Sequence, residues 1–224
     1  MLVKDWMTKG VMNLGPDTSV IDAAEILRKK NIRQMPVIDA GGRVVGIVSD
    51  RDVRDAMPSK YLPGDGAAAG ASLAALKVNE IMTPEPLTIS PEAAVESAAE
   101  LLLRHKIGGL PVAGEDGKLV GIITEVDVFR YLSHVTGLVR GGIQLVFLLP
   151  DVPGSAIDLL GRLKDEEVRL TSVLTSYDGV PAGMRKVSIR VQSAGRHTLQ
   201  SLIALLSDSY QLLYYVTDGQ AVHL

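Results

Sequence analysis

Apolar residues follow two different spacings in the first fifty positions of the chain. Val20, Ala23 and Leu27 are separated by three or four residues, which predicts a helix with one buried face. Two apolar runs, 35–38 and 43–48, follow with turn residues between them, and this order predicts a hairpin of two short strands. The pattern therefore changes from helix to strand before residue 50.

Signals for helix starts mark both ends of this pattern. Ser19 and Asp22 have the spacing of a capping box at the start of the first helix. Acidic residues from Asp50 onward suit the positive end of a helix dipole, so a second, short helix is predicted to begin there. With a short strand in front of the first helix, the predicted unit is strand, helix, strand, strand, helix.

The chain repeats this unit at an offset of 75 positions. The shift lays residues 3–57 over residues 78–132 without a gap, and roughly a third of the aligned positions are identical. We therefore assign residues 1–57 and 78–135 to two copies of one fold. Identical pairs occur along the whole unit: Met7/Met82, Thr8/Thr83, Pro16/Pro91, Val20/Val95, Pro36/Pro111, Gly46/Gly121 and Asp52/Asp127.

Residues 58–77 separate the two copies and are rich in small side chains. Their composition predicts a linker, with a helical turn at 72–76. The glycines resemble a phosphate-binding loop only superficially, because they follow no convincing strand and no Gly-Lys-Ser/Thr sequence comes after them.

A different order of elements begins at residue 142 and continues to residue 224. Apolar spacing predicts six elements, a strand, a helix, two strands joined by a loop, a helix and a strand, at 143–149, 156–163, 168–176, 185–192, 196–207 and 210–217. Four residues mark the apolar face of the first of these helices: Ala156, Ile157, Leu160 and Leu163. The order β-α-β-β-α-β is that of a ferredoxin-like sandwich, so the whole chain is predicted to have a mixed fold of the α+β or α/β class.

Composition excludes several classes of function. A net charge of -3 without any block of like charge is not typical of a protein that binds nucleic acid. The absence of cysteine excludes disulfides, thiolate nucleophiles and Cys-ligated metals. The N-terminus lacks the apolar stretch of a signal peptide, and the longest apolar run, Leu145–Leu149, is too short to cross a bilayer. A cytoplasmic protein without a membrane partner is therefore expected.

Each predicted hairpin ends in a candidate ligand site. Ser49 and Asp52 in the first copy, and Thr124 and Asp127 in the second, place a hydroxyl and a carboxylate together at the start of a helix. Such a pair can hold the diol of a ribose, because the carboxylate accepts both hydroxyl protons while the helix-start amides face an anion. The alternative is that these residues only cap their helices.

The two copies differ at positions that would decide ligand selectivity. Arg33 in the first copy corresponds to Gly108 in the second, and Arg51 corresponds to Val126. The two arginines would attract a phosphate to the first cleft, whereas Gly108, followed by Gly109, allows close approach of the backbone in the second. For Arg33 the alternative is a solvated surface charge. The two clefts are predicted to be inequivalent.

The repeats resemble cystathionine-β-synthase (CBS) domains, since Gly46–Asp52 and Gly121–Asp127 match the family pattern Gly-x-x-Ser/Thr-x-x-Asp. The resemblance implies a compact tandem pair, or Bateman module, that binds an adenosine-containing ligand such as AMP, ADP, ATP or S-adenosylmethionine. It implies no required cofactor. It also implies that the base lies near the strand entries, at Asn13, Leu14, Met35 and Pro36 or at Thr88, Ile89, Leu110 and Pro111.

The C-terminal region is similar to ACT domains, because Asp151-Val152-Pro153-Gly154 stands between its first strand and its first helix. That resemblance implies dimerisation, or a second, amino-acid-like effector beside Asp151 and Gly154. The order CBS, CBS, ACT resembles regulatory proteins of the acetoin-utilisation type. It implies a homodimer that senses a ligand without chemistry and that can act on a partner enzyme.

No group of residues predicts catalysis or a metal site. The four histidines are scattered, and none has metal-ligand spacing with a carboxylate: His105, His134, His197 and His223. Three hypotheses remain. The chain is a regulatory sensor, a scaffold or accessory protein with vestigial clefts, or a hydrolase or transferase that acts on the nucleotide. The sensor is the hypothesis that the repeats favour.

Overall fold

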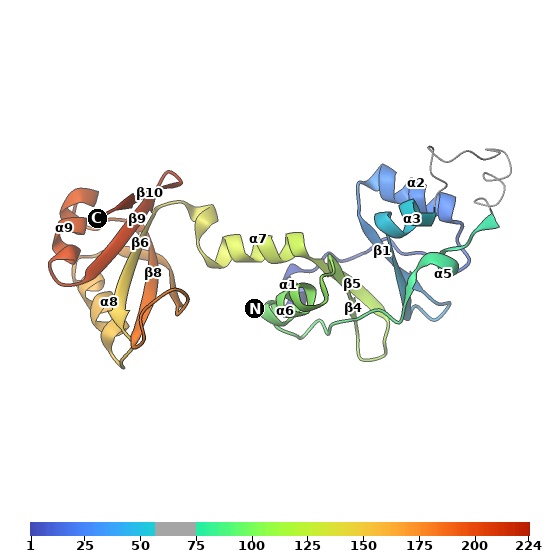
Figure 1. Ribbon diagram of the computed structural model, residues 1–224, viewed down its shortest axis with the longest axis horizontal. Helices are drawn as coiled ribbons and strands as arrows, with labels where there is room; N and C mark the ends of the chain where they lie inside the picture. The colour runs from blue at the N-terminus through green and yellow to red at the C-terminus, as the bar shows by residue number, and fades with distance from the viewer. Residues whose placement is uncertain (57–74) are drawn as a thin grey trace. The chain divides into compact units, whose positions relative to one another are not determined.

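The structure of the protein, a computed structural model, describes residues 1–56 and 75–224 (Figure 1). The chain divides into two compact units, Met1–Phe129 and Arg130–Leu224. Most of the predicted linker 58–77, including the start of its helical turn, lies outside the described residues. Within the described ranges, every helix is too short or too polar to cross a membrane.

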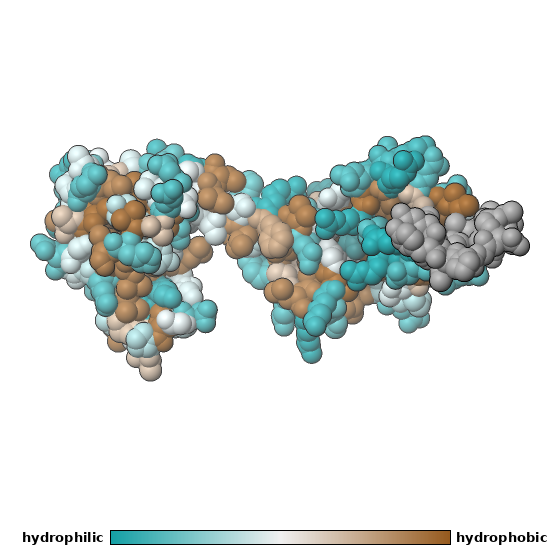
Figure 2. All heavy atoms as spheres, turned by 45° about the horizontal axis from the view of Figure 1, so that its top comes forward, coloured by the Kyte–Doolittle hydropathy of each residue, from teal (hydrophilic) through white to brown (hydrophobic). Residues whose placement is uncertain are grey.

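The long helices of the two repeats form as the apolar spacing predicts. Helix α2 (Val20–Lys30) starts after Ser19, whose hydroxyl oxygen accepts a hydrogen bond of 3.1 Å from the backbone N–H of Asp22. Helix α6 (Val95–His105) is its counterpart and starts without a side-chain cap. Both helices bury the expected apolar residues, and the outer face of α2 is hydrophilic (Figure 2).

A hairpin and a further helix follow in each repeat, also as predicted. Their bounds are β1 (Gln34–Ile38), β2 (Val44–Ser49), α3 (Asp50–Ala56), β4 (Gly109–Ala113), β5 (Leu119–Thr124) and α7 (Glu125–Val135). The strands of each hairpin are antiparallel partners. Each helix begins at the residue after the second strand ends, which brings the helix start to the edge of the hairpin.

The strand expected in front of each long helix is wrong in extent. Within its own repeat it is reduced to one parallel bridge, Leu14 with Val37 in the first and Ile89 with Val112 in the second. The Leu14 N–H donates to Pro36 O at 3.0 Å, and Leu14 O accepts from Ile38 N–H at 2.9 Å. The next donor in this ladder would be residue 16, which is a proline without an N–H, so the ladder stops. Residue 91, also proline, ends the second ladder in the same way.

Two short helices that the sequence pattern did not predict open the repeats, α1 (Val3–Trp6) and α5 (Val78–Ile81). Each of them belongs to the core of the other repeat. Val78 is fully buried in the hydrophobic cluster of the first repeat. The backbone N–H of Val3, also fully buried, donates to Ala93 O in the second repeat at 2.8 Å.

Strand pairing also joins the opening segment of each repeat to the other repeat. After α1, Thr8 forms an antiparallel bridge with Ile122 of β5 through hydrogen bonds of 2.9 and 3.0 Å. After α5, the short strand β3 (Thr83–Pro84) pairs with Gly46 and Ile47 of β2. The repeats therefore exchange their opening segments, and the first unit is one interlocked pair.

The second unit has the β-α-β-β-α-β order that the sequence predicts, with one extra strand. Its elements are η1 (Leu138–Arg140), β6 (Ile143–Pro150), α8 (Ser155–Asp165), β7 (Arg169–Ser176), β8 (Met184–Ser193), α9 (Leu199–Ser207), β9 (Gln211–Thr217) and β10 (Gln220–His223). The antiparallel sheet has the order β10-β9-β6-β8-β7, so the first and third strands of the motif lie in the centre as in a ferredoxin-like fold. The unpredicted β10 pairs with β9 across the turn at Asp218-Gly219, a dipeptide typical of tight hairpins.

Helices α8 and α9 pack their apolar residues against one face of this sheet. Leu159 and Leu163 of α8 are fully buried in the core. The expectation that Ile157 belongs to the buried face is wrong, because its side chain is 72% exposed. The helix is rotated relative to the expected face, so that Leu159 occupies the central position.

Candidate functional site

A cavity of about 680 Å³, here called cleft one, lies at the end of the first hairpin. Ser49 and Asp52 line it from the tail of the first repeat, and residues 105–109 line it from the junction between α6 and β4 of the second. Glu85, Pro86 and Leu87, which follow α5 and β3, complete the wall.

Cleft two, of about 450 Å³, is the counterpart at the end of the second hairpin. Thr124 lines it from the tail of the second repeat, residues 10–12 line it after α1, and residues 31–34 line it before β1. Each cleft thus combines the tail of one repeat with the opening segment of the other. This composite construction follows from the crosswise exchange of the opening segments.

The tail of the first repeat is held by reciprocal hydrogen bonds. Oδ2 of Asp52 accepts from the backbone N–H and from the hydroxyl of Ser49, both at 2.7 Å, and the Asp52 N–H donates to Ser49 Oγ at 3.3 Å. Oδ1 of Asp52 accepts no hydrogen bond from the described residues. The carboxylate therefore caps α3 with one oxygen, and the residue as a whole lines cleft one.

The tail of the second repeat has the same bonds in a more buried setting. Oδ2 of Asp127 accepts from Thr124 N–H at 2.9 Å and from Thr124 Oγ1–H at 2.7 Å. Asp127 is only 5% exposed and does not line cleft two, whereas Thr124, Glu125 and Val126 do. Of the two predicted carboxylates, Asp52 lines one of the two clefts described, and Asp127 lines neither of them.

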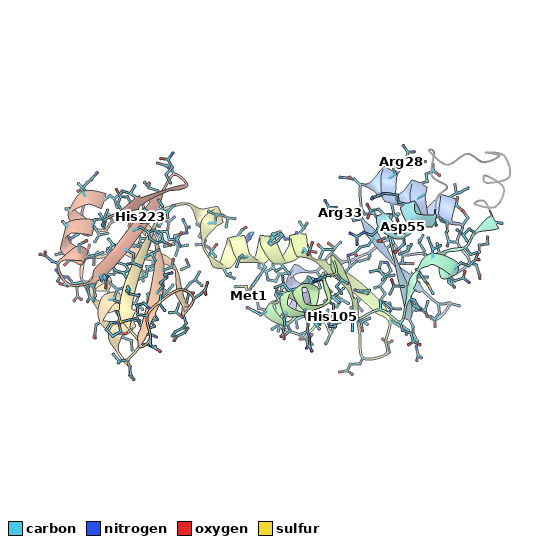
Figure 3. The ribbon with its side chains drawn as sticks, in the orientation of Figure 1. Met1, Arg28, Arg33, Asp55, His105 and His223 are labelled. Carbon is cyan, nitrogen blue, oxygen red and sulfur yellow. The ribbon has the colours of Figure 1, made fainter. Side chains whose placement is uncertain are left out.

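Basic residues are divided unequally between the clefts. Arg33, labelled in Figure 3 just before β1, lines both cavities, and Arg51 lines cleft one. Cleft one also includes His105 and Lys106, which sequence reasoning did not assign to a site. In cleft two the position equivalent to Arg51 is Val126, which is 70% exposed. The two clefts thus differ in the basic residues of their walls, as expected.

An apolar residue stands exposed in each cleft at equivalent positions. Met12 lines cleft two with 41% of its surface exposed, and Leu87 lines cleft one with 44% exposed. The two positions differ by the repeat offset of 75. Sequence reasoning missed both, although an apolar side chain in a polar segment after the opening helix was the available signal.

Most of the residues expected beside the base do not line a cleft. Pro111 lines cleft one, whereas Thr88 is exposed outside it. The others are core residues that pack under the hairpins, as their low exposure shows: Leu14, Met35, Pro36, Ile89 and Leu110. Asn13 is exposed and lines neither cleft.

Two interlocked repeats with composite clefts define a tandem-repeat module with two related cavities. The sequence matches the CBS domain family at residues 3–59 and 78–134, about half of the chain. This protein therefore belongs to the CBS domain family.

Solved CBS pairs resemble this chain over the same region. CBSX2 of Arabidopsis thaliana in complex with AMP is 36% identical, with a TM-score of 0.51, and the match covers 58% of this chain and 95% of that one. The CBS pair of protein MJ0100, in complex with 5′-methylthioadenosine and S-adenosyl-L-methionine, is 28% identical, with a TM-score of 0.50 and coverages of 59% and 96%. A putative acetoin utilization protein of Vibrio cholerae is 28% identical, with a TM-score of 0.52 and coverages of 62% and 96%.

The predicted resemblance to tandem CBS proteins of the acetoin-utilisation type is therefore confirmed for the pair. The family model does not extend to the second unit. The pair also matches inosine-5′-monophosphate dehydrogenases, of which it covers 24% of the length. A CBS pair thus occurs in free-standing proteins and within longer chains named as enzymes.

The predicted second effector loop lies between β6 and α8. Gly154 has a φ of +96° at the start of α8, and Asp151 lies 3.7 Å from Nη1 of Arg185. Ser155 Oγ accepts a hydrogen bond of 3.0 Å from Nη2 of Arg185, while Nε of this arginine is buried without a partner. A cavity of about 520 Å³ adjoins the loop at Val152, Pro153 and Ser155.

Proposed function

We propose that the protein is a non-catalytic regulatory sensor that binds an adenosine-containing ligand in the clefts of its CBS pair. The observation that carries this proposal is the wall of cleft one. It combines a carboxylate oxygen of Asp52 that no described residue occupies, a set of cations, and the exposed apolar side chain of Leu87. These are the groups that a ribose, a phosphate and a planar base require.

The roles of the individual residues follow from their chemistry. Oδ1 of Asp52 accepts a ribose hydroxyl, while Ser49 keeps the carboxylate in place through its two hydrogen bonds. Arg33 and Arg51 neutralise phosphate, and Leu87 packs on the base. In cleft two, Thr124 and Met12 take the corresponding positions with fewer cations nearby. Cleft one therefore offers more cations to a phosphate-bearing ligand, beside the acidic residues Asp50, Glu85 and Glu125 of the same wall.

The test is calorimetric titration of the parent and of the double variant Asp52→Ala/Asp127→Ala with AMP, ADP, ATP and S-adenosylmethionine. Loss of one hydrogen bond between charged and neutral groups weakens affinity by about ten- to a hundredfold. Asp55→Ala is the matched control, because Asp55 is an exposed aspartate of α3 outside the cleft walls (Figure 3). It should bind like the parent.

Two outcomes contradict the sensor proposal. If the folded double variant binds as tightly as the parent, the assigned residues are wrong. If the parent binds none of the four compounds at millimolar concentration, the clefts are vestigial and the scaffold hypothesis replaces the sensor. Conversion of ATP during incubation, detected by product analysis, would instead support the hydrolase or transferase hypothesis.

We further propose that the second unit is an ACT-like domain that pairs with a second copy and receives an amino-acid-like effector beside Asp151 and Gly154. Its sheet order and the unsatisfied Nε of Arg185 next to the loop support this proposal. Gly154→Val should weaken effector binding, because a branched residue is strained at positive φ, while nucleotide binding in the CBS pair persists. Equal effector binding by the variant would contradict this site.

A further inference from the structure

A buried arginine without a counter-ion lies on the face of the second sheet that α8 and α9 do not cover. Arg190 of β8 is 9% exposed, whereas its neighbours Ile189 and Val191 are fully buried in the helix-covered core. No carboxylate of the described residues forms an ion pair with Arg190. Arginine is rarely buried without an ion-pair partner. An anion would therefore stabilise the buried guanidinium of Arg190, and the described residues do not supply one.

Neutral groups hold Arg190 in a fixed position. Its Nε–H donates to Thr136 O at 3.0 Å, and Nη2 donates to Gln144 Oε1 at 3.3 Å. Thr136 O also accepts the hydroxyl of Ser172 at 2.8 Å. Nη1 donates to none of the described residues, so the guanidinium is positioned by two bonds and keeps donors for a ligand.

The segment that carries Thr136 fits closely over the sheet. A Cβ atom at Gly137 would lie 2.5 Å from Thr171 Cγ2 and 3.1 Å from Arg190 Cδ. Only glycine therefore allows the segment to lie this close to the arginine, and its φ of +72° also favours glycine. The position of the arginine depends on this close packing.

A cavity of about 270 Å³ opens beside this network. Ser188 lines it and accepts a hydrogen bond of 2.6 Å from Gln144 Nε2, so the hydroxyl proton of Ser188 remains available to a ligand. Leu138 and Leu174 form an apolar part of the wall, and no acidic residue lines the cavity. The cavity therefore offers a cation, a hydroxyl donor and an apolar wall within a volume that suits a small organic anion.

We propose that this cavity binds a small carboxylate with a short apolar tail, its carboxylate on Arg190 and Ser188 and its tail on Leu138 and Leu174. The site lies at the start of β6, beside Gln144, while the loop at Asp151 follows the end of that strand. The two are separated by roughly 20 Å along the strand. The proposal is thus independent of the effector loop and of the CBS clefts.

The test titrates the full chain with acetate, propionate and butyrate, with butyramide as the neutral analogue of butyrate and with inorganic phosphate. Affinity should rise from acetate to butyrate, to a dissociation constant of about 1 mM or below, the range of ligands with few heavy atoms. Butyramide should bind at least about tenfold more weakly, because it lacks the charge that the guanidinium recognises. Chemical shifts of the Arg190 Nε–H and of the Ser188 amide report binding at this place.

Arg190→Gln should lose carboxylate binding. Ser188→Ala removes the hydroxyl donor and the acceptor of Gln144 Nε2, but neither hydrogen bond of Arg190, and should weaken binding several-fold. Arg169→Gln, a change at an exposed arginine of the same sheet, should bind butyrate like the parent. If Arg190→Gln fails to fold, the proposal is tested by butyrate binding to Ser188→Ala and by the chemical shift of the Arg190 Nε–H in the parent. Unchanged binding by the folded Arg190→Gln or by Ser188→Ala, phosphate or butyramide binding as tightly as butyrate, or no response of the parent at about 20 mM butyrate would overturn the proposal.

Discussion

Two aspartates with identical backbone roles differ in what they can offer a ligand. Asp52 and Asp127 each accept two hydrogen bonds on Oδ2 from the residue three positions earlier. Asp52 is partly exposed and lines a cleft, whereas Asp127 is 5% exposed and lines none. Asp52 can therefore cap its helix and contact a ligand at the same time. At Asp127, capping is the main role.

We predict that Asp127→Ala destabilises the protein more than Asp52→Ala. Loss of a helix cap costs about 0.5–2 kcal/mol. Truncation at Asp127, which is only 5% exposed, also removes a side chain that is packed away from solvent, whereas Asp52 is partly exposed. Urea denaturation of both variants measures the difference, with Asp55→Ala as the control. Equal losses at both positions would show that burial does not distinguish them.

The second unit contains an acid-sensitive contact between α8 and the segment before α9. A hydrogen bond of 2.8 Å from His197 Nε2 lowers the pKa of Glu166 below its ordinary value of 4.5, and the charges of Arg162, His197 and Arg196 lower it further. A carboxyl group whose pKa is lowered by folding adds stability above its ordinary pKa, and this stability is lost as the pH falls through the lowered value.

We predict that Glu166→Gln is less stable than the parent at neutral pH and that the difference shrinks as the pH falls below 4.5. Thermal unfolding between about pH 3 and pH 7 measures this dependence. The adjacent Glu167→Gln carries the same charge change on a side chain that is 70% exposed. It should show little pH-dependent difference, and a similar profile for both variants would contradict the assignment to Glu166.

At the scale of elements, the sequence predicts those helices and strands whose signals come from residues close together in the chain. The spacing of apolar residues in α2 and α6 locates both helices, and turn residues locate both hairpins, because these signals are local. Helices α1 and α5 escape prediction because four residues are too few to show a helical period. Val3 and Val78 are buried by contacts with the other repeat. Such contacts between distant residues leave no pattern in the local sequence.

We predict that Val3→Ala loosens the second repeat and that Val78→Ala loosens the first. Each valine is fully buried, and its truncation should cost about 1–3 kcal/mol in lost burial and cavity formation. Hydrogen exchange resolved by residue tests the crosswise effect. Faster exchange confined to the repeat that contains the substitution would contradict the exchange of opening segments.

Part of the candidate site could be predicted from the sequence, because some of its residues also follow a local spacing. The tail pairs follow a fixed local spacing, so Ser49, Asp52 and Thr124 were found from the sequence. Leu87 and His105 were not, because they reach cleft one only through contacts between the repeats. A cleft assembled from distant segments leaves no contiguous motif.

At the scale of the whole molecule, the second unit presents an open edge of its sheet. Among the residues that the structure describes, strand β7 pairs only with β8, and three of its apolar residues are 38–40% exposed: Leu170, Val173 and Leu174. Such an edge favours pairing with another chain. It supports the proposed homodimer.

We predict that the full chain sediments as a dimer at micromolar concentrations and that Val173→Lys shifts it toward the monomer. A charge on an edge strand opposes pairing between chains. Val139→Lys, at another exposed apolar residue of this unit, is the control and should remain dimeric. A parent protein that sediments as a monomer would contradict the dimer.

The exchange of opening segments also affects synthesis on the ribosome. When Val53 has been made, the nascent first repeat still lacks Val78 and the Leu76, Ile81 and Met82 side chains that pack on the same cluster, so its apolar interior stays open. At about 5–20 residues per second, the 24 residues between Val53 and Val78 take about one to five seconds to make. The second repeat needs Val3, which is made first and must stay free until β5 exists. Neither repeat can therefore close alone during translation, and the pair closes together late in synthesis.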